Sequence, residues 1–170
     1  QKTISADTLA KSASHLVMNV LKRPDGLQDQ YAASHGGINC YTVSKTGDVA
    51  VAPLRMSQTT LDTLRDKLAL FFTGFYRQSE GNLRVQKEQS EAGEQSMLEG
   101  LHKIKEIGFQ IKEALEKGNP ETFGLLMREH WESKKKRRGE MTNSLIDQWY
   151  EKALTNGALG GKVVGAGGGA

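Results

Sequence analysis

The feature that most constrains this fold is a long amphipathic run in the middle of the chain, which stops at a glycine. Its apolar residues recur every three or four positions, which is the spacing of one face of an α-helix. They are Leu98, Leu101, Ile104, Ile107, Ile111 and Leu115, and Gly118 follows them. Asn119-Pro120-Glu121 comes next, an order of capping residue, proline and acid that is typical of a helix start. The sequence therefore predicts two consecutive helices joined by a short turn.

The second of these helices, and a third that begins at about Asn143, carry the two tryptophans of the chain. Trp131 and Trp149 both recur with other apolar residues at helical spacing, so we expect both in the core. The basic run Lys134–Arg138 is expected to be a solvated helix end. Neither His35 nor His130 stands in a catalytic pattern, and we expect both to be packed or surface residues.

The first part of the chain mixes helix and strand signals. A helix is expected from Ser5, its capping residue, to about Lys22. Residues 38–44 and 48–54 read as two short strands of a hairpin around Gly47, and residues 67–74 read as a buried strand. Strands that precede a long series of helices indicate an α+β fold.

Composition and net charge narrow the classes of function to be considered for this chain. The 170 residues are 37% hydrophobic and 25% charged, which is ordinary for a globular protein. A net charge of +3 is too small to favour a nucleic-acid partner, and no apolar run approaches the roughly 20 residues that span a bilayer. The single cysteine, Cys40, excludes an internal disulfide framework, so we expect a cytoplasmic location.

Two short stretches have the composition of functional sites. In "GLQDQYAASHGG", residues 26–37, Asp29 lies near an expected helix start. Taken alone it fits a surface helix, in which an acid is favourable near the N-terminus. Near the end, "GALGGKVVGAGGG" is rich in glycine, which lets backbone N–H groups approach a phosphate. It fails the P-loop pattern and meets the dinucleotide pattern only weakly, so a flexible tail remains an alternative.

Four stretches, taken together and in order, resemble the GHMP small-molecule kinases. They are "DQYAA..GG", "LFFTGFYR", "HW..KK" and "ID..Y..A...GA.GGK..GAGGG". The resemblance covers almost the whole chain and is closest to the sugar kinases of the D-glycero-D-manno-heptose 7-phosphate kinase type. It implies transfer of a phosphoryl group from ATP, with Mg²⁺, to a hydroxyl of a sugar or sugar phosphate. Other acceptors (galactose, fucose, mevalonate) and a non-catalytic binding module on the same fold remain alternatives.

The resemblance also implies a two-domain architecture that is incomplete at both ends. Residues 1–58 would be the C-terminal portion of a ribosomal protein S5-like N-terminal domain. Residues 59–170 would form a truncated α/β-sandwich C-terminal domain. The main phosphate-binding loop of the superfamily would lie upstream of Gln1, and so we expect this segment alone to be inactive.

The site residues carry over from the same resemblance. Asp29 would be the general base that draws the proton from the acceptor hydroxyl. Gln28 and Arg77 would lie on the substrate side, and no residue is assigned as a metal ligand. Lys134 and Lys135 could serve a sugar phosphate, although the solvated-helix interpretation is favoured. The residues expected to support the nucleotide-phosphate loop are Gly165, Ala166, Gly167, Gly168 and Gly169.

Overall fold

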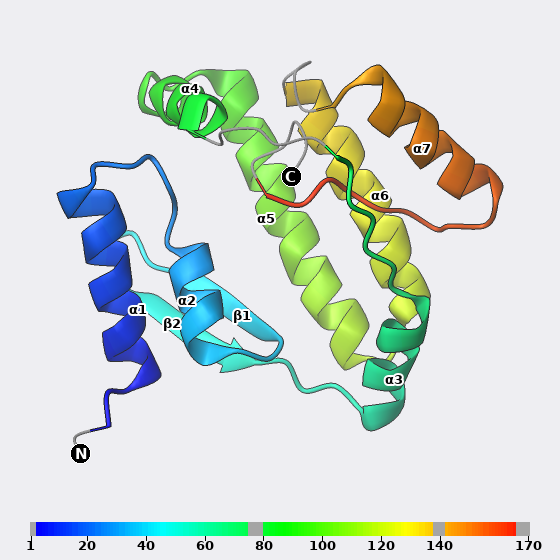
Figure 1. Ribbon diagram of the computed structural model, residues 1–170, viewed down its shortest axis with the longest axis horizontal. Coiled ribbons are helices and arrows are strands. Elements are labelled where there is room, and N and C mark those ends of the chain that lie inside the picture. The colour runs from blue at the N-terminus through cyan, green and yellow to red at the C-terminus, as the bar shows by residue number, and fades with distance from the viewer. Residues whose placement is uncertain (1–2, 75–79, 138–141, 166–170) are drawn as a thin grey trace. The chain divides into compact units, whose positions relative to one another are not determined.

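The computed structural model describes residues 3–74, 80–137 and 142–165 (Figure 1). The chain divides into two compact units, Gln1–Arg55 and Met56–Ala170. The described helices and strands are α1 (Ala6–His15), the π-helical turn η1 (Leu16–Val20), α2 (Gln28–His35), β1 (Asn39–Val43), β2 (Val49–Pro53), α3 (Gln58–Lys67), α4 (Glu80–Glu91), α5 (Gln95–Glu116), α6 (Pro120–Arg137) and α7 (Ser144–Thr155).

In the first unit, α1 begins where the sequence predicts. The Ser5 hydroxyl accepts a hydrogen bond from the backbone N–H of Thr8 at 3.1 Å, which confirms the expected N-cap. Helix α1 contacts α2, and each contributes a buried apolar residue, Ala10 and Tyr31. The two helices therefore cover part of each other's apolar surface.

The predicted hairpin is confirmed. Strands β1 and β2 pair antiparallel, with Tyr41 opposite Val51, and Gly47 lies in the turn. Between α2 and β1, Gly36 and Gly37 have φ angles of 63° and 67°, a region that glycine occupies without steric cost. These two glycines let the chain leave the helix and enter the strand, as expected.

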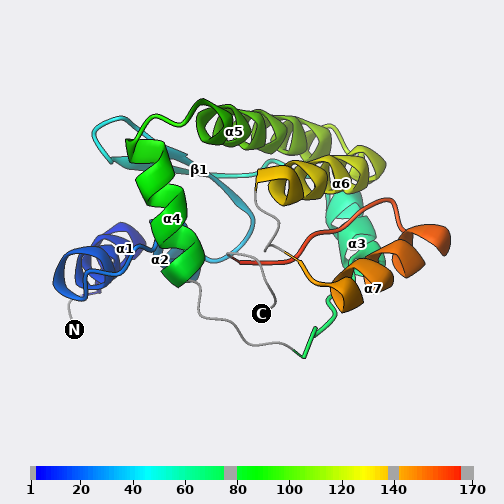
Figure 2. The same cartoon turned by 90° about the horizontal axis from the view of Figure 1, so that it is seen from above.

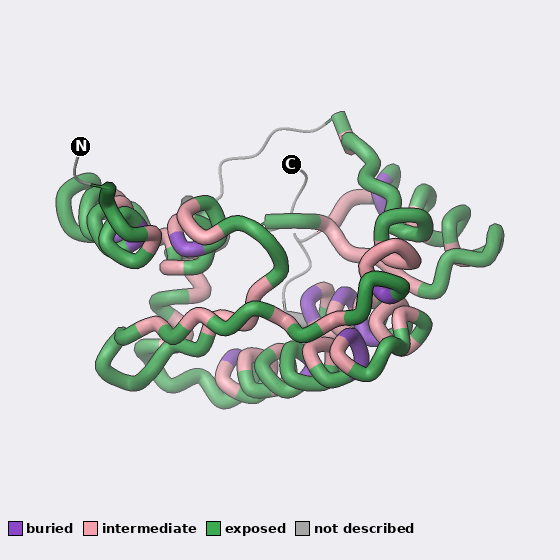
Figure 3. Tube along the Cα trace, turned by 90° about the horizontal axis from the view of Figure 1, so that it is seen from below, coloured by how far each residue is buried: buried purple, intermediate pink, exposed green. Residues whose placement is uncertain are grey.

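In the second unit, α5 and α6 lie side by side and form the core (Figures 1 and 2). The side chain of Asn119 accepts a hydrogen bond from the N–H of Thr122 at 3.0 Å, so the predicted start of α6 is confirmed. Asn143 caps α7 in the same way through the N–H of Ile146. Buried positions gather along the α5–α6 pair (Figure 3), where Ile107 and Trp131 are fully buried.

Two packing expectations are wrong. Helix α3 runs to Lys67, and the residues after it form no strand and are exposed, with 87% of Leu70 and 76% of Phe71 accessible. No described strand lies beside them to form a sheet. Trp149 is 43% exposed and is therefore not in the core, although it lies three positions from the buried Ile146 on the same helix.

The expected fold class is confirmed only in a coarser form, as a mostly helical chain with one two-stranded antiparallel sheet. The described part of residues 1–55 contains helices and one hairpin and is not an S5-like N-terminal domain. The described residues of the second unit include no strand, so they do not form an α/β sandwich. The assignment of residues 1–58 and 59–170 to two kinase domains stays a prediction.

Candidate functional site

Asp29 is the second residue of α2 and lies beside Gln28 in the first helical turn. Both side chains are exposed, and within the described ranges the Asp29 carboxylate has no hydrogen-bond or ion-pair partner. The unpaired backbone N–H groups of a helix start carry a partial positive charge, so an acidic residue is favourable in the first turn. Asp29 is therefore a solvent-facing carboxylate held on a helix.

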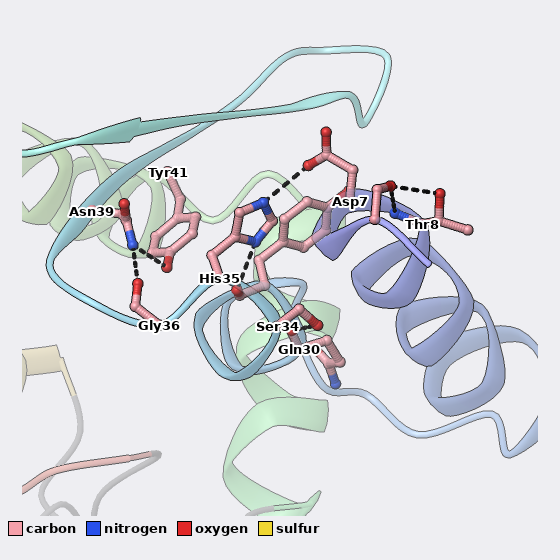
Figure 4. Close-up of polar contacts among 10 residues, drawn as sticks. Asp7, Thr8, Gln30, Ser34, His35, Gly36, Asn39 and Tyr41 are labelled. Atoms are coloured by element: carbon pink, nitrogen blue, oxygen red, sulfur yellow. Dashed lines mark hydrogen bonds and ion pairs between the residues drawn. The ribbon is translucent and has the colours of Figure 1, made fainter. Parts of the chain in front are cut away.

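The far end of the same helix is anchored by His35 (Figure 4). Its Nδ1 atom lies 3.0 Å from the carbonyl oxygen of Tyr31, and its Nε2 atom lies 3.0 Å from Oδ1 of Asp7 in α1. The imidazole also stacks on the Tyr31 ring at a centroid distance of 5.8 Å. Because both ring nitrogens face acceptors, only the imidazolium form donates to both at once.

The start of the hairpin is tied to this cluster. The Tyr41 ring meets the His35 ring edge to face at 6.5 Å. The side-chain amide of Asn39 donates to the Tyr41 hydroxyl at 3.2 Å and also to the carbonyl of Gly36 (Figure 4). The helix that carries Asp29 is thus fixed to both α1 and β1 within the first unit.

In the second unit, the glycine-rich segment 157–165, red in Figure 1, packs against α6. A Cβ atom on Gly160 would overlap the carbonyl oxygen of Gly124 and lie 2.7 Å from the backbone nitrogen of Arg128. A Cβ atom on Gly124 would lie 2.8 Å from Cβ of Leu159. Real Cβ atoms do not approach so closely, so the contact of the segment with α6 requires glycine on both sides.

A lysine of α6 holds the end of this segment. The ammonium of Lys134 donates to the carbonyl oxygen of Gly165 at 2.7 Å, and Lys134 is only 7% exposed. Its neighbour Lys135 lies over the rings of Trp131 and Tyr150 and pairs with Glu132 at 2.9 Å. The expectation that the basic run is solvated is therefore wrong for Lys134.

Burial shifts the pKa of two further groups around the segment. It lowers the pKa of the Lys162 ammonium, which has no partner among the residues described. It also raises the pKa of the Tyr150 phenol, and the nearby Glu132 carboxylate acts in the same direction. The glycine-rich segment thus carries a partly buried amine at Lys162 that has no partner among the described residues.

Comparison with known proteins decides the family. Residues 111–170 match the family described as GHMP kinases C terminal. The chain is also 32% identical over 161 residues to D-glycero-alpha-D-manno-heptose 7-phosphate kinase of Campylobacter jejuni, across 95% of this chain. The chain is homologous to the GHMP kinases. The match covers 47% of that relative, so the chain spans about half the length of the kinase it matches.

A solved structure gives the same result. The crystal structure of a D-glycero-D-manno-heptose 1-phosphate kinase from Bacteroides thetaiotaomicron superposes with a TM-score of 0.71 at 30% identity. The superposition covers 98% of the present chain and 44% of that structure. The resemblance stated from the four sequence stretches is confirmed at the level of the family.

The residues expected at the GHMP kinase site are distributed over both units. Gln28 and Asp29 are adjacent on α2, whereas Gly165 lies in the second unit. Arg77 and residues 166–169, which comprise Ala166, Gly167, Gly168 and Gly169, are outside the described residues. The roles of all these residues stay predictions. The contact made by Lys134 was missed, although its spacing of three from the buried Trp131 was a usable signal.

Neither a membrane helix nor a metal cluster is found in the described part of the chain. None of the described helices is long and apolar enough to cross a membrane. Within the same residues, no group of three or more His, Cys, Asp or Glu side chains is placed to hold a metal ion.

Proposed function

We propose that the full-length protein is an ATP-dependent kinase that phosphorylates a hydroxyl of a heptose phosphate. The two relatives are named for a heptose 7-phosphate and a heptose 1-phosphate, which supports this class of acceptor. Because the names differ in the position of the existing phosphate, the hydroxyl that is phosphorylated is left open. We also propose a cytoplasmic location and small-molecule partners only.

The reaction moves one phosphoryl group and one proton. The acceptor hydroxyl oxygen forms a bond to the γ-phosphorus of ATP, and the bond between that phosphorus and its bridging oxygen breaks to release ADP. The hydroxyl proton passes to the Asp29 carboxylate, which acts as general base. The observation that carries this role is the exposed Asp29 carboxylate, which has no partner among the described residues and is free to accept a proton.

The other assignments follow from the same proposal. Residues 165–169 support the loop that binds the ATP phosphates, while Gln28 and Arg77 contact the substrate. When Mg²⁺ is bound with ATP, it neutralises negative charge on the phosphates. The residues of the chain bind and orient the two substrates, since phosphoryl transfer depends mostly on positioning and charge stabilisation.

The test is an ADP-release assay on the full-length protein with ATP and a heptose 7-phosphate. We expect Asp29→Asn to lower kcat by about 100-fold or more, the range for loss of a general base, with little change in ATP binding. Asp66→Asn is the matched control, because Asp66 is also an exposed carboxylate with no partner among the described residues. Unchanged turnover in Asp29→Asn would remove Asp29 from the mechanism.

A panel of acceptors tests the substrate class separately. Heptose 7-phosphate, heptose 1-phosphate, galactose, fucose and mevalonate are each offered with ATP to the wild-type protein. We expect a heptose phosphate to give the highest kcat/KM. Preference for another acceptor would support kinase activity with a different substrate. No ADP release with any acceptor would favour a non-catalytic binding module.

A further inference from the structure

We propose that Lys134 is a positioning residue, which holds the glycine-rich segment 157–165 on α6 and so fixes the chain where it enters residues 166–169. Its link to nucleotide binding rests on the proposed kinase function. The hydrogen bond and the burial of Lys134 do not depend on that function. Nothing in the family resemblance assigns this role to the lysine.

The environment of Lys134 gives its ammonium a defined partner. The side chain is 7% exposed, and a cation at such a site is costly unless it is hydrogen-bonded. Its Nζ atom donates to the carbonyl oxygen of Gly165, 31 residues later in the chain, at 2.7 Å. Hydrogen bonds with a charged donor are stronger than neutral ones, so this contact restrains the position of Gly165.

A second contact fixes the same segment five residues earlier. Gly160 lies against the backbone of α6 at Gly124 and Arg128, where no side chain fits. Gly161 follows, and a Cβ atom there would lie 3.8 Å from the Tyr150 ring. The segment is therefore held by packing at Gly160 and by a hydrogen bond at Gly165, with Lys162 between these two points.

The composition of the segment explains why such restraint is needed. Glycine has more backbone freedom in the unfolded chain than any other residue, and ordering it is correspondingly unfavourable. Glycines give backbone N–H groups access to a phosphate, but they do not hold those groups in place. A buried lysine on a rigid helix supplies the restraint from outside the segment.

Amide hydrogen exchange on the full-length protein tests the restraint directly. Lys134→Met removes the ammonium and keeps the length of the side chain, and Lys136→Met makes the same charge change at an exposed position of the same helix. We expect exchange in residues 162–165 to become at least about tenfold faster in Lys134→Met, as loss of a charged hydrogen bond implies. In Lys134→Met the amides of α5 should exchange at wild-type rates. In Lys136→Met all amides should do so. Unchanged exchange in residues 162–165 would overturn the proposal.

Amine labelling of the wild-type protein gives an answer even if Lys134→Met does not fold. Reductive methylation followed by mass spectrometry should modify Lys134 at least about tenfold more slowly than Lys136, because the Lys134 ammonium is buried and already donates a hydrogen bond. Equal labelling of the two lysines would show that the contact does not persist in solution and would overturn the proposal.

Steady-state kinetics tests the link to the nucleotide. In Lys134→Met we expect a several-fold higher KM for ATP, with the KM for the sugar phosphate and the melting temperature near wild type. A general loss of packing would not change the KM for ATP while leaving the KM for the sugar phosphate unchanged. Equal changes in both KM values would overturn the nucleotide link. If the wild-type protein shows no kinase activity, the proposed function fails, while the exchange and labelling results still decide the role of Lys134.

Discussion

The Nε2 atom of His35 lies 3.0 Å from Oδ1 of Asp7, a residue 28 positions earlier in the chain. This contact joins the last residue of α2 to the first turn of α1. Asp29 lies near the other end of α2, so His35 fixes to α1 the helix that carries Asp29. His35 thus helps to hold the helix that carries the proposed base.

We expect His35→Ala to destabilise the protein more than Asp7→Asn. The Asp7 side chain is 64% exposed, and exposed ion pairs contribute less than about 1 kcal/mol to the free energy of unfolding. His35 is 17% exposed and also bonds to Tyr31 and stacks on its ring, so its loss should cost about 1–3 kcal/mol. Urea denaturation measures both values. Equal effects would mean that the Asp7 contact alone carries the contribution of His35.

Gly160→Ala should be strongly destabilising because its Cβ atom would overlap the backbone of α6 at Gly124 and Arg128. Helix backbone moves little, so we expect a loss of about 1–3 kcal/mol in the free energy of unfolding. Gly108→Ala in α5 is the control, since a Cβ atom there meets nothing within 4 Å. That variant should stabilise the helix by about 0.5–1 kcal/mol. A neutral Gly160→Ala would show that the segment does not pack on α6 in solution.

Lys162 makes stability depend on pH below 10.5. Burial lowers its pKa in the folded state from the ordinary value of 10.5. Between the lowered pKa and 10.5 the unfolded chain binds more protons, so the free energy of unfolding rises with pH in that window. Lys162→Met should flatten this rise and stabilise the protein at neutral pH. Urea denaturation at a series of pH values measures it, and an unchanged slope would place Lys162 in solvent.

Tyr150 makes the free energy of unfolding fall as the pH rises above 10, which is opposite to the effect of Lys162. Burial raises the pKa of its phenol above the ordinary value of 10.0. As pH rises past 10, the unfolded state loses this proton first, so the free energy of unfolding falls until the folded phenol ionises. Tyr150→Phe removes the titrating group, and its stability should therefore fall less steeply above pH 10. Spectrophotometric titration of the tyrosines provides an independent check on the raised pKa.

Much of the secondary structure could be predicted because its causes are local. The starts of α1, α6 and α7 each follow from one capping residue, namely Ser5, Asn119 and Asn143. Hydrophobic periodicity predicted α5, and the turn around Gly47 predicted the hairpin. Burial was less predictable. The apolar residues 68–71 are exposed because burial requires a neighbouring element, which local composition does not specify.

The sequence by itself indicated the family, predicted the helices from their periodicity, and selected Asp29 and the terminal glycines as candidate site residues. Each of these signals lies in residues that are neighbours or are regularly spaced along the chain. Only the tertiary structure decided that His35 bonds to Asp7, that Gly160 lies on Gly124, and that Lys134 is buried against Gly165. These pairs are separated by 28, 36 and 31 positions. Their contacts form only when helices pack, so the charge and size of each residue alone did not distinguish Lys134 from the solvated lysine at position 136.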